Sequence, residues 1–317
     1  MGLRIIKPPA LRPGDTIGIV TPASPMLVEK LERGVDYLRS RGYRVMIGEH
    51  VYDSHGYLAG WDKDRINDLQ AMFTNQEVKA IFSSRGGYGT PRMLDKINYE
   101  LIRNHPKIFV GYSDVTALQL AIWQHCRLVT FSGPMAAVEM GTGIAPLAEH
   151  CLWTLLGGEN SDHVFSAQGA PKLEVIRSGK ARGILLGGCL SLLNSIIGTR
   201  HQPDFTGSIL VLEDIGEQPY RVDRYLSQLR AAGILDQVNG ILLGQFVDCA
   251  EKEGEPTLTL EEIFADYFEP LAVPVLKNFM YGHVPKKFTL PLGAVVEIDS
   301  SVPTVRLLEA AVQLVLI

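Results

Sequence analysis

The chain has 317 residues, of which 46% are hydrophobic and 21% are charged, and its formal net charge is −5. These proportions exclude a disordered or fibrous chain, and at ~100–200 residues per domain the length favours two domains. No Lys/Arg-rich block offers itself to a nucleic acid, and no apolar run reaches the ~20 residues of a membrane span. The start lacks the apolar core of a signal peptide. A cytoplasmic protein with reduced thiols is therefore expected, its cysteines being Cys126, Cys151, Cys189 and Cys249.

The first half of the chain alternates strand and helix patterns. Helical spacing of apolar residues covers 26–41, 62–75 and 114–126. Apolar strand patterns cover 15–24, 43–48, 78–84, 106–113 and 127–133. This alternation predicts βαβ units and a parallel sheet, and ligands bind at the carboxyl ends of the strands of such a sheet.

The second half contains more strand than helix. Residues 156–172 are rich in Gly, Ser, Asn and Asp and are expected to be a linker between domains 1–155 and 173–317. Helices are expected at 218–233 and 260–271. Short apolar strand patterns follow at 172–179, 181–189, 208–214, 240–246, 294–299 and 312–317. The second domain is therefore predicted to be α/β or α+β.

Gly111-Tyr112-Ser113-Asp114 lies between a predicted strand and a predicted helix. A serine at such a turn is held outward, and the free N–H groups of the helix start can stabilise the oxyanion of acyl transfer. Residue 115 is Val, so the pattern departs from G-x-S-x-G. The alternative is that Ser113 or Asp114 only caps the helix.

A nucleophilic serine needs a base, and the base needs an orienting carboxylate. Among eight histidines, His283 in the loop YGHVPKK is the candidate base, with a plain surface-loop histidine as the alternative. His150 is expected to be structural, and surface positions are expected for His50, His55, His105, His125, His163 and His201. Glu213 ends an apolar strand and is the candidate acid, although Asp214 and Glu217 lie close by. The order serine, acid, histidine is that of α/β-hydrolases.

Arg85-Gly86-Gly87-Tyr88-Gly89 also follows a strand. It lacks the G-x-G-x-x-G and GK[ST] patterns, so nucleotide binding is not supported. Its glycines let backbone N–H groups approach a ligand, and one of them could complete an oxyanion hole with the Asp114 N–H. A tight βα turn without function is the alternative. The sequence has no HExxH, HxH or cysteine pair at ligand spacing, so neither metal nor cofactor is predicted.

Five segments, in this order along the chain, carry a resemblance to a known family: SSRGGYG, VGYSDVTAL, ARGILLGGCLSLL, LVLEDIGEQPYRVDRYLSQLRAAGIL and GHVPKK. The chain resembles the LD-carboxypeptidase family nearly end to end. That family includes cytoplasmic murein tetrapeptide carboxypeptidases and microcin C immunity peptidases. The resemblance implies an N-terminal flavodoxin-like parallel-sheet domain, a C-terminal swivelling β/β/α domain and a homodimer.

The resemblance also implies a site. The serine of GYSD, the glutamate of LED and the histidine of GH are Ser113, Glu213 and His283, which would act as nucleophile, acid and base. The oxyanion would be bound by the backbone N–H groups of Asp114 and Gly87. The local patterns alone also point to Ser113, Glu213 and His283, whereas the choice of Gly87 within its turn comes from the resemblance.

The activity implied is removal of the terminal D-Ala from muropeptide tetrapeptides in peptidoglycan recycling. An exopeptidase must hold a terminal carboxylate, and Arg85, beside Gly86, is the nearest candidate. Cys189 occupies a position where many relatives have Asn. An immunity-type peptidase acting on acylated peptide-nucleotides and a non-catalytic two-domain ligand binder are the alternatives, and the compact linker favours the murein branch.

Overall fold

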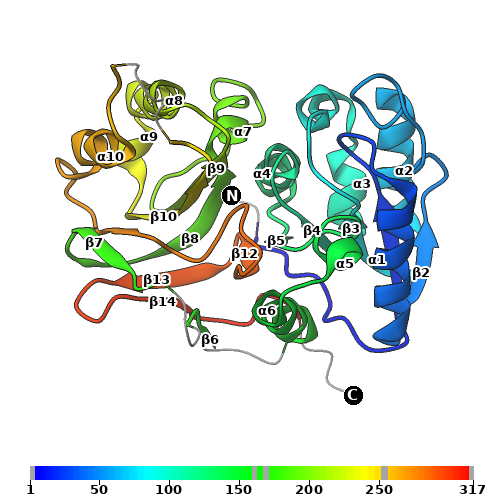
Figure 1. Cartoon of the computed structure of the whole chain (residues 1–317). Coiled ribbons are helices and arrows are strands. Elements are labelled where there is room, and N and C mark those ends of the chain that lie inside the picture. The colour runs from blue at the N-terminus through cyan, green and yellow to red at the C-terminus, as the bar shows by residue number, and fades with distance from the viewer. Residues whose placement is uncertain (1–3, 159–162, 167–170, 251–255, 314–317) are drawn as a thin grey trace.

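A computed structural model describes residues 4–158, 163–166, 171–250 and 256–313 (Figure 1). The first half of the chain supplies the following elements in order: β1 (Thr16–Val20), α1 (Val28–Ser40), β2 (Arg44–Ile47), α2 (Asp62–Thr74), β3 (Val78–Ser83), the 3₁₀ turns η1 (Thr90–Arg92) and η2 (Leu94–Lys96), α3 (Tyr99–Asn104), β4 (Ile108–Gly111), α4 (Val115–Cys126), β5 (Thr130–Ser132), α5 (Glu139–Thr142) and α6 (Pro146–Gly157).

The second half supplies more strands than helices, as the sequence predicts. Its elements are β6 (His163–Val164), β7 (Glu174–Arg177), β8 (Lys180–Cys189), α7 (Leu190–Asn194), β9 (Ile209–Ile215), α8 (Pro219–Ala231), α9 (Ile234–Gln237), β10 (Gly240–Val247), α10 (Leu260–Phe268), β11 (Val275–Lys277), β12 (Leu290–Leu292), β13 (Val295–Asp299) and β14 (Thr304–Leu307). Most of the strand expected at 312–317 lies outside the described residues, as does part of the linker expected at 156–172.

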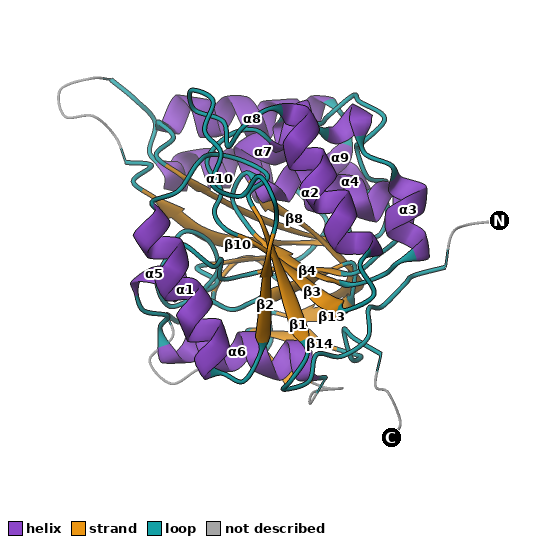
Figure 2. Cartoon of the chain, turned by 90° about the vertical axis from the view of Figure 1, so that its right-hand side faces the viewer, coloured by secondary structure: helices purple, strands orange, loops and turns teal. Residues whose placement is uncertain are grey.

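The first sheet has the strand order β12-β5-β4-β3-β1-β2. Strands β1 to β5 are parallel, and their order β2-β1-β3-β4-β5 is that of flavodoxin-like folds. Helices α2, α3 and α4 cover one face, and α1, α5 and α6 cover the other (Figure 2). The predicted flavodoxin-like parallel sheet is confirmed.

Both faces of this sheet are buried, which explains why its strands are continuously apolar. In β4, Ile108 and Val110 pack toward α1, whereas Phe109 packs toward α2 and α4. Helix α1 buries Leu31 and Leu38 on the face predicted from their spacing.

The second sheet is mixed, with the order β6-β14-β13-β8-β9-β10-β11-β7. Strands β8 to β11 run parallel and the remaining neighbours are antiparallel. Helices α7, α8, α9 and α10 pack on one side of it. The predicted combination of a flavodoxin-like sheet with a second, β-rich α/β unit is therefore present.

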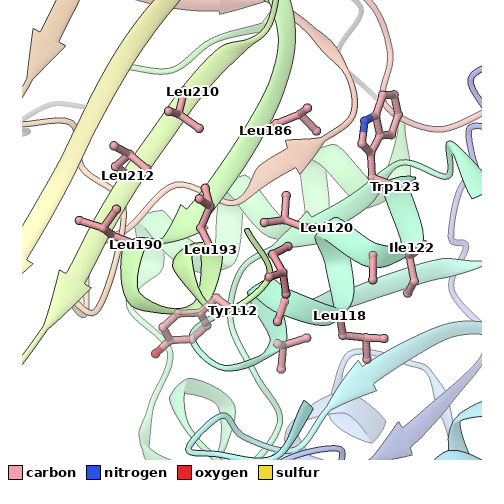
Figure 3. Packing of buried hydrophobic residues seen from close by; sticks show 14 of the residues in the cluster. Tyr112, Leu118, Leu120, Ile122, Trp123, Leu186, Leu190, Leu193, Leu210 and Leu212 are labelled. Atoms are coloured by element: carbon pink, nitrogen blue, oxygen red, sulfur yellow. The ribbon is translucent and has the colours of Figure 1, made fainter. Parts of the chain in front are cut away.

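The two halves share one buried apolar cluster. Leu120 of α4 lies in it together with Leu186 of β8 and Leu193 of α7 (Figure 3). Strand β12 joins the halves a second time, because it pairs antiparallel with β5 in the first sheet, Leu290 opposite Ser132. The chain between β11 and β12, which contains His283, therefore starts on one sheet and ends on the other.

Two further expectations concern the cysteines and membrane-spanning helices. All four cysteines are free and buried, in agreement with reduced thiols. In the part of the chain that the structure describes, no helix combines the length and apolarity needed to span a membrane.

Candidate active site

Ser113 occupies a strained turn between β4 and α4. Its φ of 65° lies in the left-handed region that non-glycine residues rarely adopt. Such a conformation costs of order 1–3 kcal/mol and persists only where the surroundings impose it. The sharp strand-to-helix turn holds the serine outward, as the sequence pattern suggested.

The neighbouring Asp114 helps to impose that turn. Its buried carboxylate accepts hydrogen bonds from the backbone N–H groups of Gly89 (3.2 Å) and Thr90 (2.8 Å). Burial raises the pKa of Asp114 to about 6, against the lowering effect of these hydrogen bonds. In the described structure α4 has no side-chain cap, so Asp114 joins the nucleophile turn to the glycine turn rather than capping its own helix.

The glycine turn leaves room for Ser113 because Gly86 and Gly87 carry no side chains. A Cβ on Gly86 would lie 2.8 Å from the Ser113 Cβ and 3.4 Å from the Asp114 nitrogen. Gly87 has a φ of 114°, and a Cβ there would lie 2.4 Å from the Ser24 Oγ. Both positions therefore require glycine, and they bring backbone groups of the RGGYG turn next to the serine.

Glu213 and His283 form a hydrogen-bonded pair, with 2.7 Å between the glutamate Oε2 and the histidine Nδ1. Glu213 is fully buried near the end of β9, opposite Cys189 of β8. Gly282 has a φ of 122°, and a Cβ there would lie 2.7 Å from the Glu213 Oε2. Glycine at 282 thus allows the histidine loop to approach the carboxylate, and no hydrogen bond from the described residues occupies the imidazole Nε2.

The other two carboxylates near Glu213 have different partners. Asp214 accepts from the Ser191 N–H at 2.8 Å, and Glu217 interacts with Arg221 and Tyr225, each at 3.4 Å. Among the described residues, Glu213 is the one of the three that hydrogen-bonds His283.

Ser113 and His283 line one cavity of about 300 Å³ together with Arg85, Gly86 and Gly87. The hydrogen bonds of the described residues do not include one between His283 and Ser113. Catalytic hydrogen bonds are often long in ligand-free enzymes and tighten when substrate binds. The structure therefore brings the predicted serine, acid, base and glycine turn together from both halves of the chain.

Two cations lie at this cavity. Arg85 donates to the carbonyl oxygens of Gly86 (3.2 Å) and Pro25 (3.1 Å), so part of its guanidinium is already occupied. Lys30 of α1 also lines the cavity, and within the described ranges no hydrogen bond or ion pair involves its ammonium group. The sequence pointed to Arg85 but not to Lys30, because a lysine on an amphipathic helix carries no local signal of function.

A buried ion pair lies close to the Glu213–His283 pair. The Lys287 ammonium is 2.6 Å from the Glu139 Oε1, which also accepts from the Tyr112 hydroxyl at 2.8 Å. The Tyr112 ring lies 3.6 Å from the same ammonium and 5.1 Å from the His283 ring. Burial raises the pKa of Glu139, but the charge and hydrogen bond of Lys287, together with hydrogen bonds from the Met135 N–H and the Tyr112 hydroxyl, lower the net pKa. This network connects Tyr112, the residue before Ser113, with the loop that carries His283.

Cys189, where many relatives were expected to have Asn, lies between the halves. Its N–H donates to the Thr116 Oγ1 of α4 at 3.3 Å, and its thiol donates to Asp214 at 3.4 Å. Burial, followed by the charge of Asp214, raises the pKa of this thiol well above its usual value. A neutral, unreactive thiol is expected near neutral pH.

The expectation that His201 lies on the surface is wrong. Its side chain is buried, and its ring nitrogens lie 3.1 Å from the His125 Nε2 and 3.0 Å from the Asp95 Oδ1. The ring of Tyr99 stacks on His125. These contacts join α4, in the first half, to the loop after α7, and a polar sequence context did not indicate them.

One group of side chains could in principle hold a metal ion. Ligand atoms of His50, Asp53 and Asp64 lie within 4.8 Å of one another in the described part of the chain. His50 and Asp53 already form an ion pair at 3.2 Å. None of the three lines the cavity of Ser113, so this group has no place in the chemistry derived for that site.

Comparison with known proteins places this geometry in a family. Residues 17–133 match the LD-carboxypeptidase N-terminal domain, and residues 182–298 match the LD-carboxypeptidase C-terminal domain. A "Probable murein peptide carboxypeptidase" of Bacillus subtilis (strain 168) is 40% identical over 307 residues, covering 96% of this chain and 95% of the relative.

The names of two further relatives mention different ligands, a murein tetrapeptide and glutamyl sulfamoyl guanosine. The murein tetrapeptide carboxypeptidase of Pseudomonas aeruginosa is 32% identical and covers 87% of this chain and 91% of its own. The structure of MccF in complex with glutamyl sulfamoyl guanosine matches with a TM-score of 0.88 and 26% identity, over 97% of this chain and 99% of that one. The chain belongs to the LD-carboxypeptidase family. It is thus a peptidase, a hydrolase of peptide bonds.

Proposed function

We propose that this protein is a metal-independent serine carboxypeptidase that removes the terminal D-Ala from muropeptide tetrapeptides in the cytoplasm, during peptidoglycan recycling. The observation that carries the proposal is the Glu213–His283 pair facing the cavity of a strained Ser113. The names of the Bacillus and Pseudomonas relatives support a murein peptide as substrate. The family resemblance supports a homodimer.

The chemistry follows from the groups at the cavity. The Ser113 Oγ bonds to the carbonyl carbon of the residue before D-Ala, and His283 takes the proton of the serine hydroxyl in the same step. Glu213 holds the imidazole through Nδ1 and stabilises its charged form. The backbone N–H groups of Asp114 and Gly87 stabilise the oxyanion, and losing one such donor typically costs ~10²–10³ in kcat.

Two steps complete the turnover. The carbon–nitrogen bond breaks as His283 gives its proton to the amine of D-Ala, which leaves an acyl ester on Ser113. Water then attacks this ester, His283 accepts its proton, and the serine hydroxyl is restored. Arg85, Gly86 and Lys30 line the same cavity as Ser113, and the two cations can pair with the terminal carboxylate of the D-Ala.

A second candidate substrate is an acylated peptide-nucleotide. The fold matches the structure of MccF in complex with glutamyl sulfamoyl guanosine with a TM-score of 0.88. The same three residues would then cleave an acyl bond next to a nucleotide rather than next to D-Ala.

The deciding experiment measures D-Ala release from a muropeptide tetrapeptide by the wild type and by Ser113→Ala, each with EDTA. Release by the wild type alone, unaffected by EDTA, is expected, and loss of the nucleophile lowers kcat by as much as ~10⁶. Release that survives Ser113→Ala would contradict the assigned nucleophile. No release by the wild type, with hydrolysis of an aspartyl sulfamoyl adenosine instead, would select the second substrate.

A further inference from the structure

A second, larger cavity lies in the first half of the chain, with a volume of about 750 Å³. Its lining includes Tyr57 and Trp61, whose side chains are 65% and 63% exposed. Large aromatic rings left this exposed are uncommon in a well-packed protein and mark surfaces that bind other molecules.

The glycine turn connects residues of this cavity with residues of the cavity of Ser113. Gly87 lines the cavity of Ser113, and the next residue, Tyr88, contacts Tyr57 with 5.6 Å between ring centroids. Consecutive Cα atoms are about 3.8 Å apart, so the aromatic surface begins one residue from the proposed oxyanion donor.

The aromatic rings are held in place before any ligand binds. Trp61 stacks on His55 with 4.0 Å between ring centroids, and His55 and Leu58 exchange backbone hydrogen bonds of 2.8 and 3.1 Å. Asp62, next to Trp61, accepts from Arg65 at 2.6 Å. A preorganised surface of this kind loses little conformational entropy on binding.

Charged groups of both signs surround the rings. The carboxylates of Asp62 and Asp64 line the cavity beside the cations Arg92 and Lys96, and both of these cations donate to Asp62 within 3.3 Å. Of the three cations in the lining, Arg92 and Lys96 are paired with Asp62, which leaves Lys63 alone among the described lining residues for a nucleotide phosphate. Sugar hydroxyl and acetamido groups both donate and accept, and the C–H faces of sugar rings pack on aromatic rings.

We infer that this second cavity binds the N-acetylated sugar of the muropeptide while the peptide reaches Ser113. The inference rests on the proposed function, because it names the remote part of that substrate. The three residues between the scissile bond and the sugar span about 10–11 Å when extended, so the sugar lies outside the cavity of Ser113 while the peptide is bound there. Binding energy from such a remote group can be used to orient the scissile bond.

The test compares two substrates: the free tetrapeptide and the same tetrapeptide attached to its disaccharide. Trp61→Ala and Tyr57→Ala should each lower kcat/KM about fivefold or more for the sugar-bearing substrate and leave the free tetrapeptide unchanged. Tyr52→Ala is the matched control, since Tyr52 is 46% exposed but does not line the cavity. An equal loss on both substrates, or none on either, would overturn the inference.

A binding experiment makes the inference independent of turnover. The disaccharide without peptide is titrated into Ser113→Ala and into Ser113→Ala/Trp61→Phe, with tryptophan fluorescence as the readout. A saturable change that depends on Trp61 supports the sugar site even if the wild type cleaves neither substrate, a result that would overturn the proposed function alone. No change, or a change produced by adenosine monophosphate instead, would overturn the sugar site.

Discussion

Single residues in this site differ in role because their surroundings differ. Glu213, Asp214 and Glu217 are three carboxylates within five positions of the chain, yet the described contacts direct them to a histidine, a backbone amide and an arginine. Glu213 is fully buried and its Oε1 has no partner among the described residues. Its charge is therefore directed mainly at His283.

This difference predicts the outcome of two matched substitutions. Glu213→Gln should lower kcat by about 10⁴, because an amide neither fixes the imidazole tautomer nor stabilises its charge. Glu217→Gln should leave kcat within a few-fold of the wild type. Steady-state kinetics of D-Ala release measure both, and a large loss in Glu217→Gln with none in Glu213→Gln would reverse the assignment.

The residue patterns predicted which side chains meet, but not everything around them. Ser113, Glu213 and His283 each follow a local signal at a strand end or in a glycine-flanked loop. Lys30 and the Lys287–Glu139 pair have no such signal, because their partners are distant in sequence. Only the packed chain brings them to the site.

The helices and strands were predicted well where the regular spacing of apolar residues extends over many positions. Helices α1, α2, α4, α8 and α10 lie where apolar spacing placed them. Strand β12 was not predicted, since it has three residues and a central proline. It is stable at the sheet edge because the Pro291 position needs no N–H donor there.

The buried ion pair gives the histidine loop a measurable dependence on Glu139. Lys287→Met should lower the free energy of unfolding by about 3–5 kcal/mol, because it leaves the Glu139 carboxylate buried without its cation. Lys287→Met/Glu139→Gln should recover most of this loss. Urea unfolding measures each variant, and Lys286→Met, at an exposed neighbouring position, is the control. Equal stability of Lys287→Met and wild type would contradict the role assigned to the pair.

Helix α1 packs so closely on the segment before α5 that one glycine cannot be replaced. A Cβ on Gly34 would lie 1.9 Å from the Ala136 carbonyl oxygen. Alanine normally favours a helix over glycine by about 1 kcal/mol, but the displaced backbone should cost more, about 1–3 kcal/mol net. Thermal unfolding of Gly34→Ala should therefore show a lower midpoint than Glu32→Ala, which is exposed on the same helix. A raised midpoint would show that the contact relaxes freely.

At the scale of the whole molecule, the contact between the two halves contains a pair of histidines. Burial, then the charges of His201 and Arg200, lowers the pKa of His125. The folded protein therefore binds a proton there less readily than the unfolded chain, whose histidines titrate near ~6.5. Its stability should fall as the pH drops below that value.

This pH dependence can be assigned to one side chain. Between pH 7.5 and 5.5 the urea midpoint of the wild type should fall more than that of His125→Gln, which has nothing to protonate. His105→Gln, at an exposed position, should follow the wild type. Parallel declines in all three proteins would exclude His125 as the source.

Strand β12 also bears on the order in which the protein folds. Leu290 pairs with Ser132 across 158 positions of the chain, and such non-local pairings form late because a long loop must first be closed. The segment with His283 is fixed at both ends only after this pairing. Each sheet can thus gain its own structure while the enzyme is still inactive. The return of peptidase activity would then mark the last step of folding rather than the first appearance of structure.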